Sequence, residues 1–233
     1  MAYLYHYTNN ISLIKILVSQ TFKFGHLQNT NDPCERLENR FGLSGNYSSI
    51  IDKYLDQLCD FYNKKTSIAC FGVKNGNISA DLKWTMWANY SYKSTGACMV
   101  FDKNKFINVI KQEGVMPLEK RIKYNLGSIR FNLTEQIIDL PHKDFLTKYQ
   151  DKLLFSKHKD WSYEKEFRIV VFEENFKIPI THCLEKVFYG PEIDQSDEEC
   201  CKNLIRLFNC NIKNEKLKIS ASIIHKPLNC FPD

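Results

Sequence analysis

Two glutamates and an arginine at alternate positions, Glu164, Glu166 and Arg168, form the stretch of the sequence best suited to chemistry. In an extended segment, side chains two residues apart point to the same face, so all three are expected to project to one side. Two neighbouring carboxylates are costly to ionise together without a cation or hydrogen-bond donor nearby, and their pKa values should separate, as acid–base chemistry often requires. Arg168 is a candidate for that cation. The alternative is a surface Glu–Arg pair, which would contribute little.

A histidine and a threonine close the aromatic N-terminal segment Tyr-His-Tyr-Thr. His6 and Thr8 stand directly before a run rich in Ile and Leu. A strand that ends in two hydrogen-bonding side chains before a helix can place both at the lip of a cleft. The alternative for His6 is a partly buried structural histidine.

Aromatic and hydroxyl side chains are dense over residues 84–96. Such a stretch can form a stacking platform for a planar ring, such as nicotinamide or a nucleobase. Core packing is the alternative for Trp84 and Trp87, at least one of which is expected in the core. Tyr90 and Ser94, nearer the following loop, are the better functional candidates.

A turn-rich loop over residues 27–35 carries Asp32 and Glu35. Pro33 restricts Asp32 to extended conformations, and short polar side chains that form Asx turns explain most of this loop as structure. Asp32 and Glu35 are therefore only weak functional candidates.

The elements that must position these residues alternate irregularly between strands and helices. Apolar runs and turn signals predict strands at 3–7, 67–73, 95–101, 121–124, 186–190 and 217–225 and an extended segment at 161–172, and helical spacing predicts helices at 11–18, 45–63, 82–90, 106–112, 144–158 and 198–208. Asn9 or Asn10 can cap the first helix. This irregular order favours an α+β fold over a doubly wound parallel sheet.

Composition indicates one folded domain over residues 1–233, because 43% of the residues are hydrophobic and no linker rich in Pro, Gly or Ser divides the chain. The nine cysteines show no CxxC pair and no zinc-ligand spacing, so neither a disulfide framework nor a metal site is expected. The N-terminus has no basic and apolar leader, and no run approaches membrane-spanning length. A cytoplasmic protein without membrane contact is expected.

The net charge of +5 is compatible with a polyanionic partner but does not require one. Lysines gather moderately just ahead of the glutamate pair, at Lys143, Lys148, Lys152, Lys157 and Lys159. We expect them to form the solvated face of a helix. The alternative is an edge that follows phosphates beside a site.

Motifs in order along the chain resemble those of a large bacterial family long catalogued only as a domain of unknown function. They are Tyr5-His6-Tyr7-Thr8, Asn31-Asp32-Pro33 with Glu35, Cys70-Phe71, Met86-Trp87-Ala88-Asn89-Tyr90, Gly96 with Phe101-Asp102, and Lys159, Trp161 and Tyr163-Glu164-Lys165-Glu166-Phe167-Arg168. The resemblance covers nearly the whole chain. The opening His-x-Thr strand and the late Glu-x-Glu pair also look like the sites of ADP-ribosyltransferases, including those that modify nucleic acids in toxin and phage-defence systems.

This resemblance implies an ADP-ribosyltransferase-like α+β fold, with mixed, mostly antiparallel sheets and flanking helices, and NAD as the substrate without a metal. His6 would fix the ribose, Tyr90 would stack on nicotinamide, and Arg168 would hold Glu166 or a phosphate. Thr8, Trp87 and Ser94 complete the NAD-binding set that the resemblance implies.

The two glutamates would share the chemistry of transfer. Breaking the nicotinamide–ribose bond passes through an oxocarbenium-like state that a carboxylate stabilises, and Glu166 is our choice for that role. Glu164 would orient or deprotonate the acceptor. Related enzymes with a Glu-x-Glu pair usually begin with arginine, whereas those that begin with histidine usually carry a single glutamate. Because this chain combines both patterns, which of Glu164 and Glu166 is catalytic stays open.

The expected function is therefore an NAD-dependent ADP-ribosyltransferase, a toxin or phage-defence effector that modifies nucleic acid (RNA or DNA) or protein, with an antitoxin as a further partner. One alternative is a nucleic-acid-binding module or nuclease that uses the lysine-rich edge, and another is a non-catalytic relative that binds a nucleotide. A nuclease needs several carboxylates around a metal, whereas a transferase needs one beside a ribose-holding histidine.

Overall fold

The computed structural model describes residues 2–40, 49–73, 83–125, 140–208 and 212–217. Its strands are β1 (Tyr3–Thr8), β2 (Thr21–Lys23), β3 (Gly25–His26), β4 (Ser67–Gly72), β5 (Ala97–Asp102), β6 (Leu118–Arg121), β7 (Lys123–Asn125), β8 (Ser156–His158), β9 (Glu166–Val171), β10 (Lys177–Pro179), β11 (Leu184–Tyr189) and β12 (Lys213–Lys216). Its α-helices are α1 (Asn10–Ser19), α2 (Leu37–Arg40), α3 (Ser49–Lys65), α4 (Trp84–Tyr90), α5 (Lys103–Gln112), α6 (His142–Lys148), α7 (Gln150–Leu153) and α8 (Gln195–Phe208), and its 3₁₀ turns include η1 (Leu27–Asn29), η2 (Pro33–Glu35) and η5 (Lys159–Glu164).

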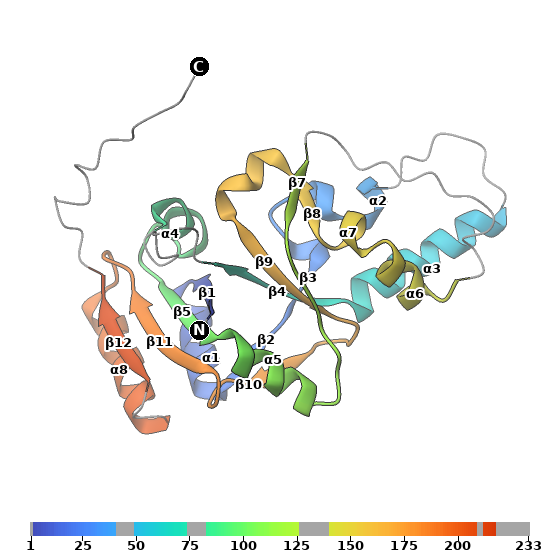
Figure 1. Ribbon diagram of the computed structural model, residues 1–233. Helices are drawn as coiled ribbons and strands as arrows, with labels where there is room; N and C mark the ends of the chain where they lie inside the picture. Colours follow the sequence, from blue (N-terminus) through green and yellow to red (C-terminus); the bar gives the residue numbers. More distant parts are fainter. Residues whose placement is uncertain (1, 41–48, 74–82, 126–139, 209–211, 218–233) are drawn as a thin grey trace, which may run out of the picture.

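One large sheet crosses the described part of the chain, in the order β12-β11-β5-β1-β4-β9-β6, with β3 beside β4 (Figure 1). Its neighbouring strands run antiparallel except for the parallel pair β11 and β12. Two small sheets, β10 with β2 and β7 with β8, lie beside it. The fold is thus a mixed one with a mostly antiparallel sheet and flanking helices, as the sequence predicts.

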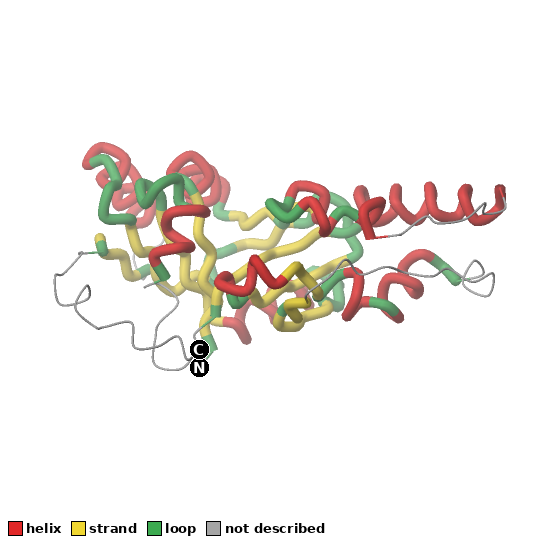
Figure 2. The backbone as a smooth tube through the Cα atoms, turned by 90° about the horizontal axis from the view of Figure 1, so that it is seen from above, coloured by secondary structure: helices red, strands yellow, loops and turns green. Residues whose placement is uncertain are grey.

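Helices cover both faces of the sheet (Figure 2). On one face, a core that includes Leu4, Phe71 and Ile169 packs against α1, α5 and α8. The other face carries two separate cores, one under α3, α6 and α7 and one under α4. Because strand side chains alternate, β9 sends Phe167 and Ile169 to the first face and its charged residues to the second.

The sheet opens between its two central strands. β1 pairs with β5, and β4 pairs with β9, along their whole lengths. Between β1 and β4, by contrast, the register pair is Tyr5 opposite Gly72. Beyond that pair the strands separate, and the opening leaves space in the middle of the sheet.

Many elements form where the sequence predicts them. Helix α1 follows β1 directly, and the side chain of Asn9, one of the two expected caps, accepts a hydrogen bond from the Ser12 amide at 2.8 Å. Asp32 is extended, with φ −87° and ψ 107°, as Pro33 requires. None of the described helices combines the length and the apolar character needed to cross a membrane.

Three predicted elements near the glutamate pair are wrong. The helix expected over 144–158 is instead the short helices α6 and α7 followed by strand β8. The segment 161–172 is not extended throughout, because a 3₁₀ turn runs to Glu164 and Lys165 then takes a left-handed conformation, φ 48°. The strand expected over 121–124 is divided between β6 and β7 at Ile122. The strand expected over 217–225 lies almost wholly outside the described residues, and β12 forms just before it.

Gly96 packs the end of α4 closely against the end of β1. A β-carbon at this position would lie 2.1 Å from the Thr8 carbonyl oxygen and 2.9 Å from Asn9 Cα. We expect Gly96→Ala to lower the free energy of unfolding by about 1–3 kcal/mol, because backbone atoms must move to relieve the contact. Urea unfolding measures this loss. Gly25→Ala is the control, since its β-carbon would meet nothing nearer than 3.9 Å, and equal losses in both variants would contradict the explanation.

Candidate active site

A cavity of about 400 Å³ lies where β1 and β4 separate. This volume is in the range of small-molecule sites. Its walls come from residues 5–7 of β1, residues 68–72 of β4, the loop 29–31 and the α4 side chains Met86, Asn89 and Tyr90. Lys157, Glu164 and Glu166 also line it. The cavity therefore brings His6, Tyr90 and both glutamates of the sequence motif together.

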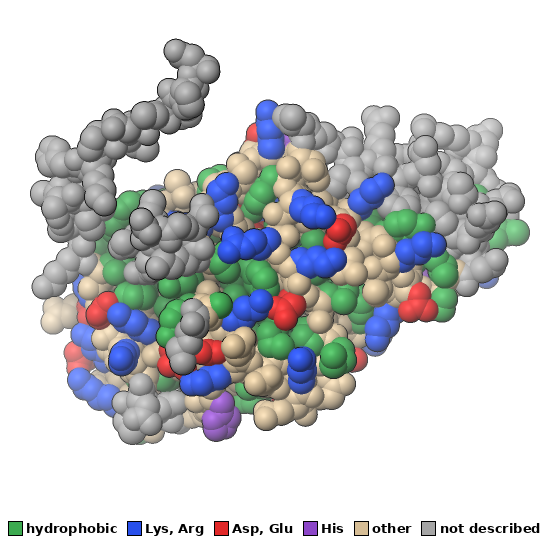
Figure 3. Space-filling view, in the orientation of Figure 1, with side chains coloured by type: hydrophobic (Ala, Val, Ile, Leu, Met, Phe, Trp, Pro, Cys, Tyr) green, Lys and Arg blue, Asp and Glu red, His purple; other side chains and the backbone are tan. Residues whose placement is uncertain are grey.

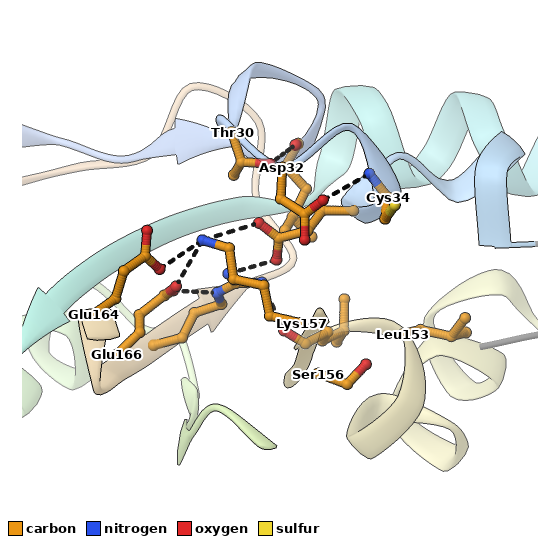
Figure 4. A network of polar contacts seen from close by, with 12 residues as sticks. Thr30, Asp32, Cys34, Leu153, Ser156, Lys157, Glu164 and Glu166 are labelled. Atoms are coloured by element: carbon orange, nitrogen blue, oxygen red, sulfur yellow. Dashed lines mark hydrogen bonds and ion pairs between the residues drawn. The ribbon is translucent and has the colours of Figure 1, made fainter. Parts of the chain in front are cut away.

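The two glutamates converge although only one of them lies on a strand. The left-handed residue Lys165 turns the chain between the 3₁₀ turn and β9, and both carboxylates face the Lys157 ammonium (Figure 4). Lys157 Nζ lies 2.7 Å from Glu164 Oε2 and 3.3 Å from Glu166 Oε2. All three side chains are at most 5% exposed. Lys157 thus supplies the cation that two adjacent carboxylates require.

Arg168 and Glu35 extend this group of charges below the cavity. Arg168 is fully buried, and its Nε lies 2.7 Å from Glu166 Oε1. Its Nη2 lies 2.6 Å from Glu35 Oε1, and Nη1 donates to the Leu154 carbonyl at 2.9 Å. Glu35 Oε2 in turn lies 3.6 Å from Lys157 Nζ. We call Glu35, Lys157, Glu164, Glu166 and Arg168 the buried charge cluster.

The two glutamates of the cluster differ in protonation. Burial alone would raise the pKa of Glu166, but Arg168 and Lys157 outweigh it and lower the pKa to about 2. For Glu164, burial raises the pKa above the ordinary value, and Lys157 and Tyr90 offset only part of that effect. At neutral pH, Glu166 is therefore a fixed anion, whereas Glu164 is suited to exchange a proton.

Tyr90 joins α4 to the cluster. Its hydroxyl donates a hydrogen bond to Glu164 Oε1. Burial, reinforced by this bond, raises the pKa of Tyr90, so the phenol stays protonated. The hydroxyl therefore holds Glu164 in place from the cavity side, and the ring forms part of the wall.

His6 stands at the opening of the sheet, on the face opposite the charge cluster. Its Nδ1 lies 3.2 Å from the Cys70 carbonyl, which can only accept, so Nδ1 carries the hydrogen. Burial lowers the pKa of His6, and the carbonyl offsets part of this effect. The ring is packed edge-on against Phe22, with centroids 4.8 Å apart. Neutral His6 therefore has Nε2 as a hydrogen-bond acceptor.

The remaining sequence candidates lie outside the cavity lining. Trp87 is fully buried and packs edge-on against Tyr7. Thr8 is buried at the end of β1, and Ser94 has a left-handed backbone, φ 67°, in the turn after α4. Arg168 contacts Glu35 and Glu166 and does not line the cavity. Of these four described residues, only Arg168 forms an ion pair with a residue of the cavity lining, Glu166.

Sequence reasoning missed the two members of the cluster that come from other segments. Lys157 was expected on a solvated helix face, which is wrong: it lies on β8 with 4% of its side chain exposed. Glu35 appeared only as a weak loop candidate, and it is fully buried. The sequence did indicate that the glutamate pair needs a cation nearby. The spacing of the lysines did not single out Lys157 as that cation, and the turn residues around Glu35 did not show that Glu35 joins the same cluster.

Acid should weaken the fold through Glu166. The folded-state pKa, about 2, is below the ordinary value of 4.5, so ionised Glu166 stabilises the fold above pH 4.5 and this stability is lost as the pH falls toward 2. The expected loss is about 3 kcal/mol. Urea unfolding of wild type and Glu166→Gln between pH 5 and pH 2 measures it. The variant should show a weaker dependence on pH, and identical curves would contradict this account.

Comparison with known proteins supports the family resemblance. Residues 86–169 match the model of a family described as Protein of unknown function (DUF2971). This match confirms the expected resemblance to a family catalogued without an assigned function. No curated protein matches the sequence.

Two solved structures of DarT from Thermus sp. 2.9 are similar to this chain. One is in complex with ADP-ribosylated ssDNA, with 10% sequence identity, a TM-score of 0.38 and coverage of 93% of this chain and 93% of that chain. The other is in complex with NAD+, with 10% identity, a TM-score of 0.38 and coverage of 91% of this chain and 94% of that chain.

Proposed function

We propose that the protein is an NAD-dependent ADP-ribosyltransferase whose active site is the cavity between β1 and β4. The observation that carries the proposal is that one cavity is lined by His6, Tyr90 and the pair Glu164 and Glu166. A neutral histidine lines the same cavity as a fixed carboxylate and a proton-exchanging carboxyl group. A pair of carboxyl groups in different protonation states is what breaking and remaking a glycosidic bond commonly uses.

In the proposed reaction, the bond between ribose C1′ and the nicotinamide nitrogen breaks, and its electron pair leaves with nicotinamide. Ionised Glu166 stabilises the positive charge that develops on the ribose. His6 Nε2 accepts a hydrogen bond from a ribose hydroxyl, and the Tyr90 ring packs against nicotinamide. The acceptor then attacks C1′, and Glu164 takes its proton.

The charge cluster favours this reading over a metal-dependent nuclease. A nuclease would use converging carboxylates to hold a metal ion. Here Lys157 occupies the position between the carboxylates, and Arg168 takes the remaining contacts. Within the described residues, no group of three His, Cys, Asp or Glu side chains is placed to hold a metal ion.

The distribution of surface charge also disfavours the alternative function, in which a lysine-rich edge binds nucleic acid. Figure 3 shows lysine and arginine side chains spread over one face with acidic side chains among them, rather than gathered in one ridge. Several surface lysines of the described residues are paired with carboxylates, as in Lys103 with Glu119 at 2.8 Å and Lys120 with Asp151 at 2.7 Å. Paired charges attract a polyanion less than an unpaired ridge would.

Incubation with NAD labelled in the adenylate phosphate and a cell lysate tests the proposal. We expect label in a macromolecular fraction, and digestion with nuclease or protease then decides whether the acceptor is nucleic acid or protein. His6→Ala should abolish transfer, whereas His182→Ala, at an exposed position, should not change it. Absence of label in every fraction, or equal labelling by His6→Ala, would refute the proposal. A toxin or phage-defence role and an antitoxin partner would be sought once the acceptor is known.

A further inference from the structure

We propose that Glu35 is a positioning residue whose negative charge, acting through Lys157 and Arg168, makes Glu164 rather than Glu166 the carboxyl group that gains and loses a proton in the cavity. Glu35 does not line the cavity and is fully buried beneath it. It therefore acts on the site only through the two cations. The part of this inference that concerns catalysis rests on the proposed function.

The buried charge cluster contains one more carboxylate than cations. Glu35, Glu164 and Glu166 share the two positive charges of Lys157 and Arg168. With all five groups ionised, the cluster carries one net negative charge in a buried environment, where an uncompensated charge is costly. A proton on one of the three carboxylates removes that cost.

The distances show which carboxylate is least compensated. Glu166 contacts both cations, at 2.7 Å from Arg168 and 3.3 Å from Lys157. Glu35 also contacts both, at 2.6 Å from Arg168 and 3.6 Å from Lys157. Among the cations of the described residues, Glu164 pairs with Lys157 alone, which it shares with the other two. As the pH falls, Glu164 is therefore expected to be the first of the three carboxylates to take up a proton.

The other groups that face Glu164 do not supply a compensating positive charge to its carboxylate. Tyr90 from α4, Tyr124 from β7 and Tyr163 beside it are phenols with raised pKa values, so they are neutral at physiological pH. Lys83 donates to the backbone carbonyl of Glu164 at 3.3 Å rather than to its side chain. Within the described residues, the protonation of Glu164 thus depends on how much of Lys157 remains available to it.

Backbone hydrogen bonds hold Glu35 in place beside Lys157 and Arg168. Its amide donates to the Asp32 carbonyl at 3.0 Å, and its own carbonyl accepts from the Tyr62 hydroxyl at 2.9 Å. Asp32 in turn accepts from the Cys34 amide at 2.9 Å and closes the same turn. The short turn η2 thus fixes a counter-charge 3.6 Å from Lys157. Without the charge of Glu35, the positive charges of Lys157 and Arg168 should compensate only the two glutamates that line the cavity.

Titration of ¹³C-labelled glutamate carboxyl groups by NMR tests the inference without NAD. Glu164→Gln, Glu166→Gln and Glu35→Gln assign the three signals. In the wild type, the Glu164 carboxyl signal should titrate at a higher pH than the Glu166 signal. In Glu35→Gln, the Glu164 midpoint should fall by about one pH unit or more. Glu35→Asp, which keeps the charge, should stay near the wild-type midpoint, and Glu174→Gln, at an exposed position, should leave it unchanged.

An unchanged Glu164 midpoint in Glu35→Gln would overturn the inference. If Glu35→Gln does not fold, the wild-type titration still decides, because a Glu166 signal that titrates at a higher pH than the Glu164 signal would refute the assignment. If the wild type transfers ADP-ribose, the acidic limb of its pH profile should move to lower pH in Glu35→Gln. If it transfers none, the proposed function fails while the NMR titration still tests the role of Glu35.

Discussion

Replacing Glu166 by glutamine is expected to lower the rate of ADP-ribose transfer by about 10²- to 10³-fold, which is the typical effect of losing one fixed electrostatic contact to a transition state. The low pKa of Glu166, about 2, keeps it ionised at every pH at which the protein is folded well. Glutamine preserves the shape but removes the charge that stabilises the oxocarbenium-like ribose. The initial rate of label transfer from NAD measures the effect.

Two controls separate this loss from a general loss of structure. Glu185→Gln removes an exposed carboxylate on β11 that pairs with Lys105 on α5. Because Glu185 is not a member of the buried charge cluster, the rate should be unchanged. Circular dichroism at the assay pH should show that Glu166→Gln remains folded. A rate within threefold of wild type in a folded Glu166→Gln variant would show that Glu166 does not have the role assigned to it.

Replacing Lys157 by methionine is expected to lower the free energy of unfolding by about 3–5 kcal/mol, as for other buried ion pairs that lose one partner. Methionine keeps most of the length of the lysine stem. It leaves Glu164 and Glu166 buried beside each other, with Arg168, which contacts Glu166, as the one remaining cation of the buried charge cluster. Urea unfolding at pH 7 measures the loss.

The matched control is Lys65→Met. Lys65 pairs with Glu174 at 2.9 Å, but about half of each side chain is exposed, so solvent screens the pair and its loss should cost less than about 1 kcal/mol. Part of the loss in Lys157→Met should be recovered at acidic pH, where Glu164 is protonated. Equal stability losses in the two lysine variants would show that the buried cluster is not held by Lys157.

Local patterns predicted the elements that depend on neighbouring residues. Aromatic residues marked β1, and the pair Asn9 and Asn10 marked the start of α1, because strand propensity and capping act over a few residues. His6, Tyr90, Glu164 and Glu166 were chosen from such patterns, and the structure places all four at one cavity. Their catalytic and binding roles stay predictions.

The rest of the cluster could not be predicted because it depends on contacts between distant segments. Lys157 lies in a short strand that packs against β7, η2 and η5, and no local period identifies such a strand. Glu35 is brought to Arg168 across 133 positions of sequence. The conformation of Lys165, which turns Glu164 toward Glu166, is unusual for a residue other than glycine and has no sequence signal here.

Release of nicotinamide from NAD in a single turnover, with protein in excess, tests the central claim most directly. It requires neither a known acceptor nor a partner. We predict that the wild type releases up to one nicotinamide per NAD and that Glu166→Gln and His6→Ala release it at least about a hundredfold more slowly. No release by the wild type with any acceptor fraction added, or equal release by all three proteins, would contradict the assignment of the cavity between β1 and β4 as an NAD-cleaving site.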